Sequence, residues 1–167
     1  MKLGTLRDGG RDGRLVVVSG DVTLASDARH LARTLQRALD DWDRAGPALE
    51  LIARGVASDA QPVLRFHERE ALAPLPRAYQ WIEDDGGAPR WRLAGGFHAP
   101  RSGIPAGEVA AGVAVLIGDV GLGADPAEAA AAIRLVALVV EAAPEGGAAF
   151  SPVAVTPDEL GAAWDGA

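Results

Sequence analysis

Short apolar runs separated by turn residues open the chain. The runs at residues 2–6 and 14–19 flank the stretch DGGRDG, which is rich in residues that tolerate the positive φ angles of a tight turn. This pattern predicts a β-hairpin over the two runs, and residues 22–24 are a candidate third strand.

Over residues 31–42 the apolar positions recur at steps of three and four, which is the period of an α-helix. Ser26 or Asp27 is placed to cap this helix, because a side-chain oxygen there can accept a hydrogen bond from an unpaired backbone N–H. The pair Gly46-Pro47 predicts the end of the helix, and a second helix is expected over residues 48–57.

Strand-like runs dominate the second half of the chain. Residues 109–117 are small and β-branched, which suits a strand buried on both faces. Pro126 predicts the start of a helix that reaches about residue 133, because its missing N–H costs nothing in a first turn. The other predicted elements are strands at 63–68, 90–97, 135–140 and 150–155, a proline-rich linker at 72–76 and a short closing helix at 157–164.

These elements predict an α+β, β-rich fold. Residues 1–76 combine a hairpin with helices, whereas residues 77–167 are mostly strands. A chain of 167 residues is long enough for one domain, or for one domain and a small appendage.

Composition excludes several classes of partner and chemistry. The formal net charge of −7 disfavours nucleic acid and anionic membranes as partners. The chain contains no cysteine, so thiolate catalysis and zinc–thiolate sites are excluded. Its start is charged and lacks the apolar segment of a signal peptide, and no apolar run reaches the length of a membrane span. We therefore expect a cytoplasmic protein.

Five segments carry a family resemblance. They are MKLGTLRDGGRDGRLVVVS, LQRALDDW, PLPRAYQW, VAVLIGDVGLGADPAEAAAAIRLVALV and AFSPVAVTPDELGAAW. In this order they resemble the fumarylacetoacetate hydrolase (fumarylacetoacetase) family, over most of the chain. The resemblance implies a small N-terminal domain at residues 1–76 and a truncated mixed β-roll at residues 77–167. It also implies a homodimer.

The same resemblance indicates that the family's chemistry is missing. Its members hold a divalent cation with carboxylates and cut a carbon–carbon bond, and two ligands come from a Glu-x-Glu pair whose positions here are Ala110 and Gly112. A third ligand position is Glu141, and a lysine and a threonine near residues 145–149 are absent. We expect neither metal nor cofactor, and no metal-dependent hydrolysis.

Three residues are the catalytic candidates. His98 lies on a loop bounded by Gly and Pro, where it could act as an acid or a base or be an ordinary loop residue. Glu141 ends an apolar strand, where it could carry a proton or face water. Glu108 precedes another strand and could be a displaced carboxylate of the old site.

Three further residues are the candidates for substrate binding. Tyr79 and Trp81 could line a pocket mouth or pack a domain junction. Arg101 could hold an anionic group through a bidentate hydrogen bond or be a surface residue.

Two functions are compatible with this pattern. One is the metal-independent acid–base processing of a small carbonyl compound, by isomerisation, cyclisation or decarboxylation. Such a reaction would suit specialised metabolism. The other is a non-catalytic pseudoenzyme that acts as a binding or regulatory partner. An enclosed apolar pocket with a convergent His or Glu favours the enzyme, whereas an exposed apolar patch favours the binding partner.

Overall fold

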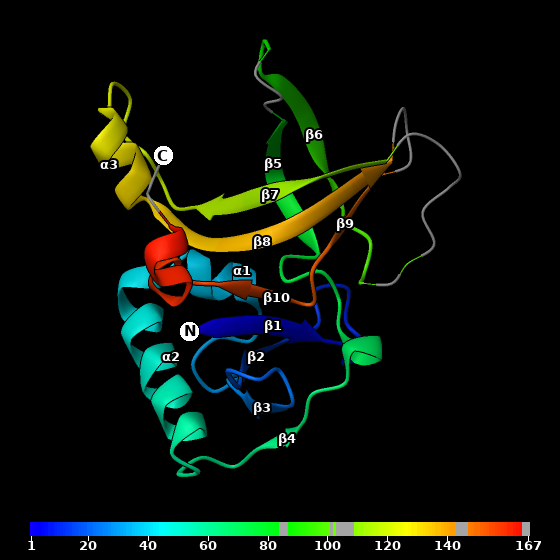
Figure 1. Cartoon of the computed structure of the whole chain (residues 1–167), viewed down its shortest axis with the longest axis vertical. Coiled ribbons are helices and arrows are strands. Elements are labelled where there is room, and N and C mark those ends of the chain that lie inside the picture. The colour runs from blue at the N-terminus through cyan, green and yellow to red at the C-terminus, as the bar shows by residue number, and fades with distance from the viewer. Residues whose placement is uncertain (84–86, 101, 103–108, 143–146, 165–167) are drawn as a thin grey trace.

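The computed structural model describes residues 1–83, 87–100, 102, 109–142 and 147–164, and it has the predicted β-rich α+β fold (Figure 1). Its main sheet is antiparallel, with the strand order β4-β3-β2-β1-β10-β8-β7, and β9 pairs with β8 beside this path. β5 and β6 form a separate hairpin. The strands are β1 (Lys2–Leu6), β2 (Arg14–Val18), β3 (Leu24–Asp27), β4 (Leu64–Arg65), β5 (Arg77–Glu83), β6 (Arg90–Gly96), β7 (Val109–Ile117), β8 (Ile133–Ala142), β9 (Ala148–Phe150) and β10 (Val153–Val155). The helices are α1 (Leu35–Leu39), α2 (Trp42–Ala57), α3 (Pro126–Ala131) and the 3-10 helices η1 (Glu68–Glu70) and η2 (Pro157–Ala163).

The first and last strands of the chain lie side by side in the main sheet. β1 lies between β2 and β10, in the register Lys2 opposite Val155. The amino group of Met1 donates to Thr156 Oγ1 at 2.5 Å. The hydrogen bond from Lys2 holds the pKa of the Glu159 carboxyl below its usual value. Strands from both sides of residue 76 thus share one sheet, and the division of the chain into two domains there stays a prediction.

The predicted cap at Ser26 or Asp27 is wrong, because both residues lie in β3 and pair with β2. In the strand, the Asp27 carboxylate accepts a hydrogen bond from Arg14 at 3.3 Å. Helix α1 begins only after Thr34, whose hydroxyl accepts the N–H of Arg37 at 3.3 Å. The helix predicted over residues 31–42 is therefore found only at Leu35–Leu39, and a second helix, α2, begins at Trp42.

The predicted break at Gly46-Pro47 is also wrong, because both residues lie inside α2. Gly46 allows the indole of Trp42 to pack closely, since a Cβ on Gly46 would lie 3.1 Å from Trp42 Nε1. Pro47 removes one backbone hydrogen bond near the start of the helix. The buried face of the helix, which includes Ala45 and Leu49, offsets that loss.

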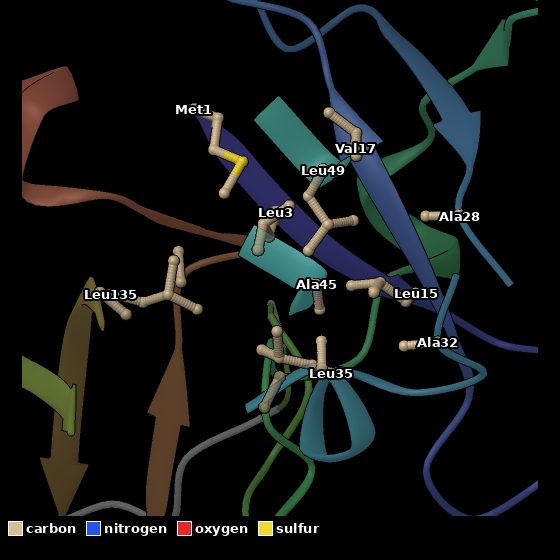
Figure 2. Packing of buried hydrophobic residues seen from close by; sticks show 14 of the residues in the cluster. Met1, Leu3, Leu15, Val17, Ala28, Ala32, Leu35, Ala45, Leu49 and Leu135 are labelled. Atoms are coloured by element: carbon tan, nitrogen blue, oxygen red, sulfur yellow. The ribbon is translucent and has the colours of Figure 1, made fainter. Parts of the chain in front are cut away.

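The main core lies between the sheet and these helices, and it extends to β8 through Leu135 (Figure 2). Leu3, Leu15, Leu49 and Leu135 are each fully buried. The first strands of the chain, α2 and the long β8 are therefore held by one apolar cluster.

Smaller corrections concern the ends of elements. The strand predicted at 22–24 is found at Leu24–Asp27, because Val22 adopts a positive φ of 61° in the preceding turn. Residues 150–155 form two strands, β9 and β10, separated by Ser151 and Pro152. The linker at 72–76 is partly buried, and the Pro74 carbonyl accepts a hydrogen bond from Thr5 Oγ1 at 2.6 Å.

β7 is a strand as predicted, but the expectation that it is buried on both faces is wrong. Its inner face packs Ala114 into the core, whereas alternate residues on the outer face are exposed. We call five outer-face residues of β7 and β8 the outer patch: Val109 (56% exposed), Val113 (62%), Val115 (46%), Ile117 (53%) and Leu138 (64%). Sequence pattern indicated an apolar strand but could not indicate which face the fold covers.

Candidate functional site

Three aromatic rings join the β5–β6 hairpin to the main sheet. Trp81 from β5, Phe97 after β6 and Phe150 from β9 lie with ring centroids 4.7 to 5.5 Å apart. Their tilted and edge-on arrangement is the one that aromatic quadrupoles favour. Trp81 Nε1 also donates to Glu83 Oε1 at 3.1 Å. The cluster therefore fixes the hairpin on the inner side of the sheet.

Glu141 lies on the same inner face, near the end of β8. It is opposite Ala110 of β7 and Ala148 of β9, and directly opposed residues point to the same face of a sheet. Two residues further along β7, and on the same face, Gly112 is opposite Val139. Glu141 is half-buried, whereas Ala110 and Gly112 are exposed. The Glu141 carboxylate therefore lies beside the small residues Ala110 and Gly112, on the sheet face that also carries Phe150.

This register brings together the three positions that the family resemblance singles out. Positions 110, 112 and 141 share one face, but only Glu141 supplies a carboxylate. Hard dications such as Mg²⁺ and Ca²⁺ take about six to eight oxygen ligands. Among the described residues, no group of three or more His, Cys, Asp or Glu side chains could hold a metal ion. The residues that the structure describes on this face do not fit the family's cation.

His98 pairs with β9 along the edge that β8 does not occupy. Its N–H donates to the Ala148 carbonyl at 2.9 Å, and it forms a parallel bridge with Ala149. Bridged residues share a face, so His98 lies on the face opposite to that of Glu141. Its imidazole covers Gly147, where a Cβ would lie 2.6 Å from Nε2. His98 and Glu141 thus flank β9 on its two edges and do not point to one centre.

The other predicted site residues are dispersed or undescribed. Tyr79 is 73% exposed, whereas Trp81 belongs to the aromatic cluster. Glu108 and Arg101 lie outside the described residues. All six assignments of catalytic or binding roles remain predictions.

A charged hollow in the first part of the chain was not predicted. It has a volume of about 670 Å³ and lies between the turn at residues 8–13 and the segment at residues 31–44. Arg44 pairs there with Asp41 at 2.5 Å, and the hydrogen bond from Arg77 lowers the pKa of the Asp12 carboxyl. None of the six predicted site residues lines it. The sequence predicts these charged side chains to be ordinary surface ion pairs. The fold brings them together around one hollow.

The fold and the site positions define a β-rich α+β protein in which the described end of the β7–β8 inner face carries Glu141 beside the small residues Ala110 and Gly112. Residues 1–77 match the family model for the fumarylacetoacetase N-terminal domain 2. The match confirms the resemblance for this part of the chain and supports membership of the fumarylacetoacetase-like family. No curated protein matches the chain. Within the described residues, no helix combines the length and apolar character that crossing a membrane requires.

Proposed function

We propose that the protein is a non-catalytic, fumarylacetoacetase-like binding partner that lacks the dication-dependent hydrolysis of the family. The observation that carries this proposal is the inner face of β7 and β8, where positions 110, 112 and 141 meet but hold a single carboxylate. Two further observations support it. His98 lies on the opposite face from Glu141, and the outer patch exposes five large apolar side chains.

A metal titration tests this proposal. We expect calorimetry with Mg²⁺, Mn²⁺ or Ca²⁺ to show no micromolar binding by the protein. The double variant Ala110→Glu/Gly112→Glu adds two carboxylates to the face of Glu141, so we expect it to gain measurable binding. Micromolar binding by the unchanged protein would contradict the proposal.

The chain offers a matched control for this titration. Val109→Glu/Ala111→Glu adds the same two charges to the same strand, but on its outer face. We expect this variant to bind no more metal than the unchanged protein. If both double variants bound the cation equally, added charge alone would account for the gain.

One observation favours a second function, the acid–base processing of a small carbonyl compound. Glu141 is half-buried and shares its face with Phe150 of the aromatic cluster, so an apolar substrate could rest beside a proton carrier. Such chemistry exchanges an acidic C–H of the substrate with solvent.

Deuterium uptake separates the two functions. In heavy water, a panel of β-dicarbonyl acids and enolisable ketones would take up deuterium faster with the protein if the second function holds. Glu141→Gln would then slow the uptake by about 10²- to 10⁴-fold. We expect uptake at the rate of the buffer alone, as the binding function requires.

A further inference from the structure

The charged hollow between the turn at residues 8–13 and the segment at residues 31–44 has the size of a small-molecule site. Its volume is about 670 Å³, and pockets for small molecules measure about 300–1,000 Å³. The buried Ala32 and the half-buried Leu31 both line the hollow and pack on the main core. The hollow therefore offers a ligand some apolar surface in addition to its charged walls.

Hydrogen bonds within the chain fix both walls of the hollow. On one wall, the Arg33 carbonyl accepts the N–H of Leu15 from β2 at 3.2 Å, and the Thr34 hydroxyl caps α1. On the other wall, the Asp12 carboxylate accepts hydrogen bonds from Arg77 Nε at 2.7 Å and Arg77 Nη2 at 2.5 Å. Walls that are already ordered reduce the entropy cost of binding a ligand.

Four arginines and four aspartates line the hollow, but most of these charges are already neutralised. Three of the aspartates form ion pairs with arginines, which are Asp12–Arg77, Asp40–Arg37 and Asp41–Arg44. Arg77 does not line the hollow, so it neutralises one lining carboxylate from outside. The lining arginines therefore outnumber the carboxylates that are left to pair with them.

Two lining arginines keep their guanidinium groups available. Within the described part of the chain, Arg11 and Arg33 form no ion pair and no side-chain hydrogen bond. Asp8 is the lining aspartate without an ion pair among the described residues, and its Oδ1 accepts the N–H of Gly10 at 2.9 Å. Two free cations thus face the hollow against one carboxylate, in a chain whose net charge is −7.

We infer that the charged hollow binds a small organic dianion, with Arg11 and Arg33 each holding one oxyanion group from the two walls. A guanidinium presents paired N–H donors that match the oxygens of a carboxylate or a phosphate. The carbon chain of the ligand rests on Leu31 and Ala32. This site goes beyond the function proposed above, because it shares no residue with the face of Glu141.

Calorimetry with glutarate tests the site, and valerate is the matched ligand because it has the same number of carbons but one carboxylate. We expect glutarate to bind with sub-millimolar affinity and valerate to bind at least about 10-fold more weakly. Sulfate, a dianion without a carbon chain, should also bind more weakly than glutarate. Phosphoglycolate replaces one carboxylate with a phosphate, so the tighter of these two ligands identifies the second oxyanion group. Amide NMR shifts caused by glutarate should be concentrated in residues 8–13 and 31–44.

Arg33→Gln tests the proposed contact directly. We expect it to weaken glutarate binding by about 10- to 100-fold, because a charge-assisted hydrogen bond is lost. The backbone bond between Arg33 and Leu15 does not involve the side chain, so circular dichroism should show an unchanged fold. Arg54→Gln is the control, because Arg54 is exposed on α2 and does not line the hollow. We expect it to leave binding unchanged.

Asp8→Asn tests the same site in the opposite direction. It removes the remaining negative charge, while the Asn Oδ1 can still accept the N–H of Gly10. We expect glutarate to bind about 2- to 5-fold more tightly. Asp59→Asn is the control, because Asp59 lies outside the hollow and Asn tolerates its positive φ of 56°. This control separates a local effect from a change in net charge.

Absence of glutarate binding at millimolar concentration, equal binding of valerate, or NMR shifts away from both walls would overturn the inference. Equal losses in Arg33→Gln and Arg54→Gln would also overturn it. None of these outcomes affects the metal titration. Conversely, micromolar cation binding would contradict the proposed function and leave the dianion site standing.

Discussion

Leu49→Ala is expected to lower the free energy of unfolding by about 2–5 kcal/mol. Leu49 is fully buried on α2, and Figure 2 shows it within the cluster formed with Leu3 and Val17. The truncation removes apolar contacts and leaves a cavity that the sheet and helix can only partly close. Urea unfolding followed by circular dichroism measures the change.

Leu51 provides the matched control, because it lies in the same helix but is 63% exposed. Leu51→Ala makes the same chemical change with little loss of buried contacts, so we expect a change within about 0.5 kcal/mol. Equal destabilisation by the two variants would show that α2 does not pack on the sheet through the face described above.

Phe150→Ala is expected to destabilise the protein by about 3–5 kcal/mol and to release the β5–β6 hairpin. Phe150 is 7% exposed and contacts both Trp81 and Phe97. An isolated two-stranded hairpin is marginally stable at best, so this hairpin depends on the aromatic contacts. Hydrogen exchange should show lost protection of the amides in residues 77–83.

Tyr79→Ala is the control for this variant, because Tyr79 lies on the same hairpin and is 73% exposed. We expect its hydrogen exchange to match that of the unchanged protein. Full protection of the hairpin in Phe150→Ala would mean that the aromatic cluster does not hold it.

Several elements could be predicted because local chemistry decides them. The turn residues of DGGRDG specify the first hairpin, which is found as β1 and β2. Asp125 and Pro126 specify the start of α3, where Asp125 and Glu128 form a reciprocal capping box. The family resemblance belongs here as well, and it is confirmed over residues 1–77.

Other features depend on contacts between residues far apart in the chain. Asp27 lies in a strand because β2 pairs with it, and Gly46-Pro47 stays helical because α2 packs on the core. Of the candidate site, the sequence supplied Glu141 and the missing carboxylates at positions 110 and 112. The sequence could not show on which face of the sheet His98 lies, because that depends on the bridge between His98 and Ala149.

Residue identity and short-range periodicity were enough to predict the fold class and the first hairpin, whereas the loss of the carboxylate pair is what the family resemblance implies for positions 110 and 112. Which face of β7 is covered depends instead on contacts with elements far away in the chain. The same alternation of small and branched residues suits a strand with one or two buried faces, and the covering elements decide between them. The covering elements leave the outer patch exposed, and strand pairing with β9 places Glu141 and His98 on opposite faces of the sheet.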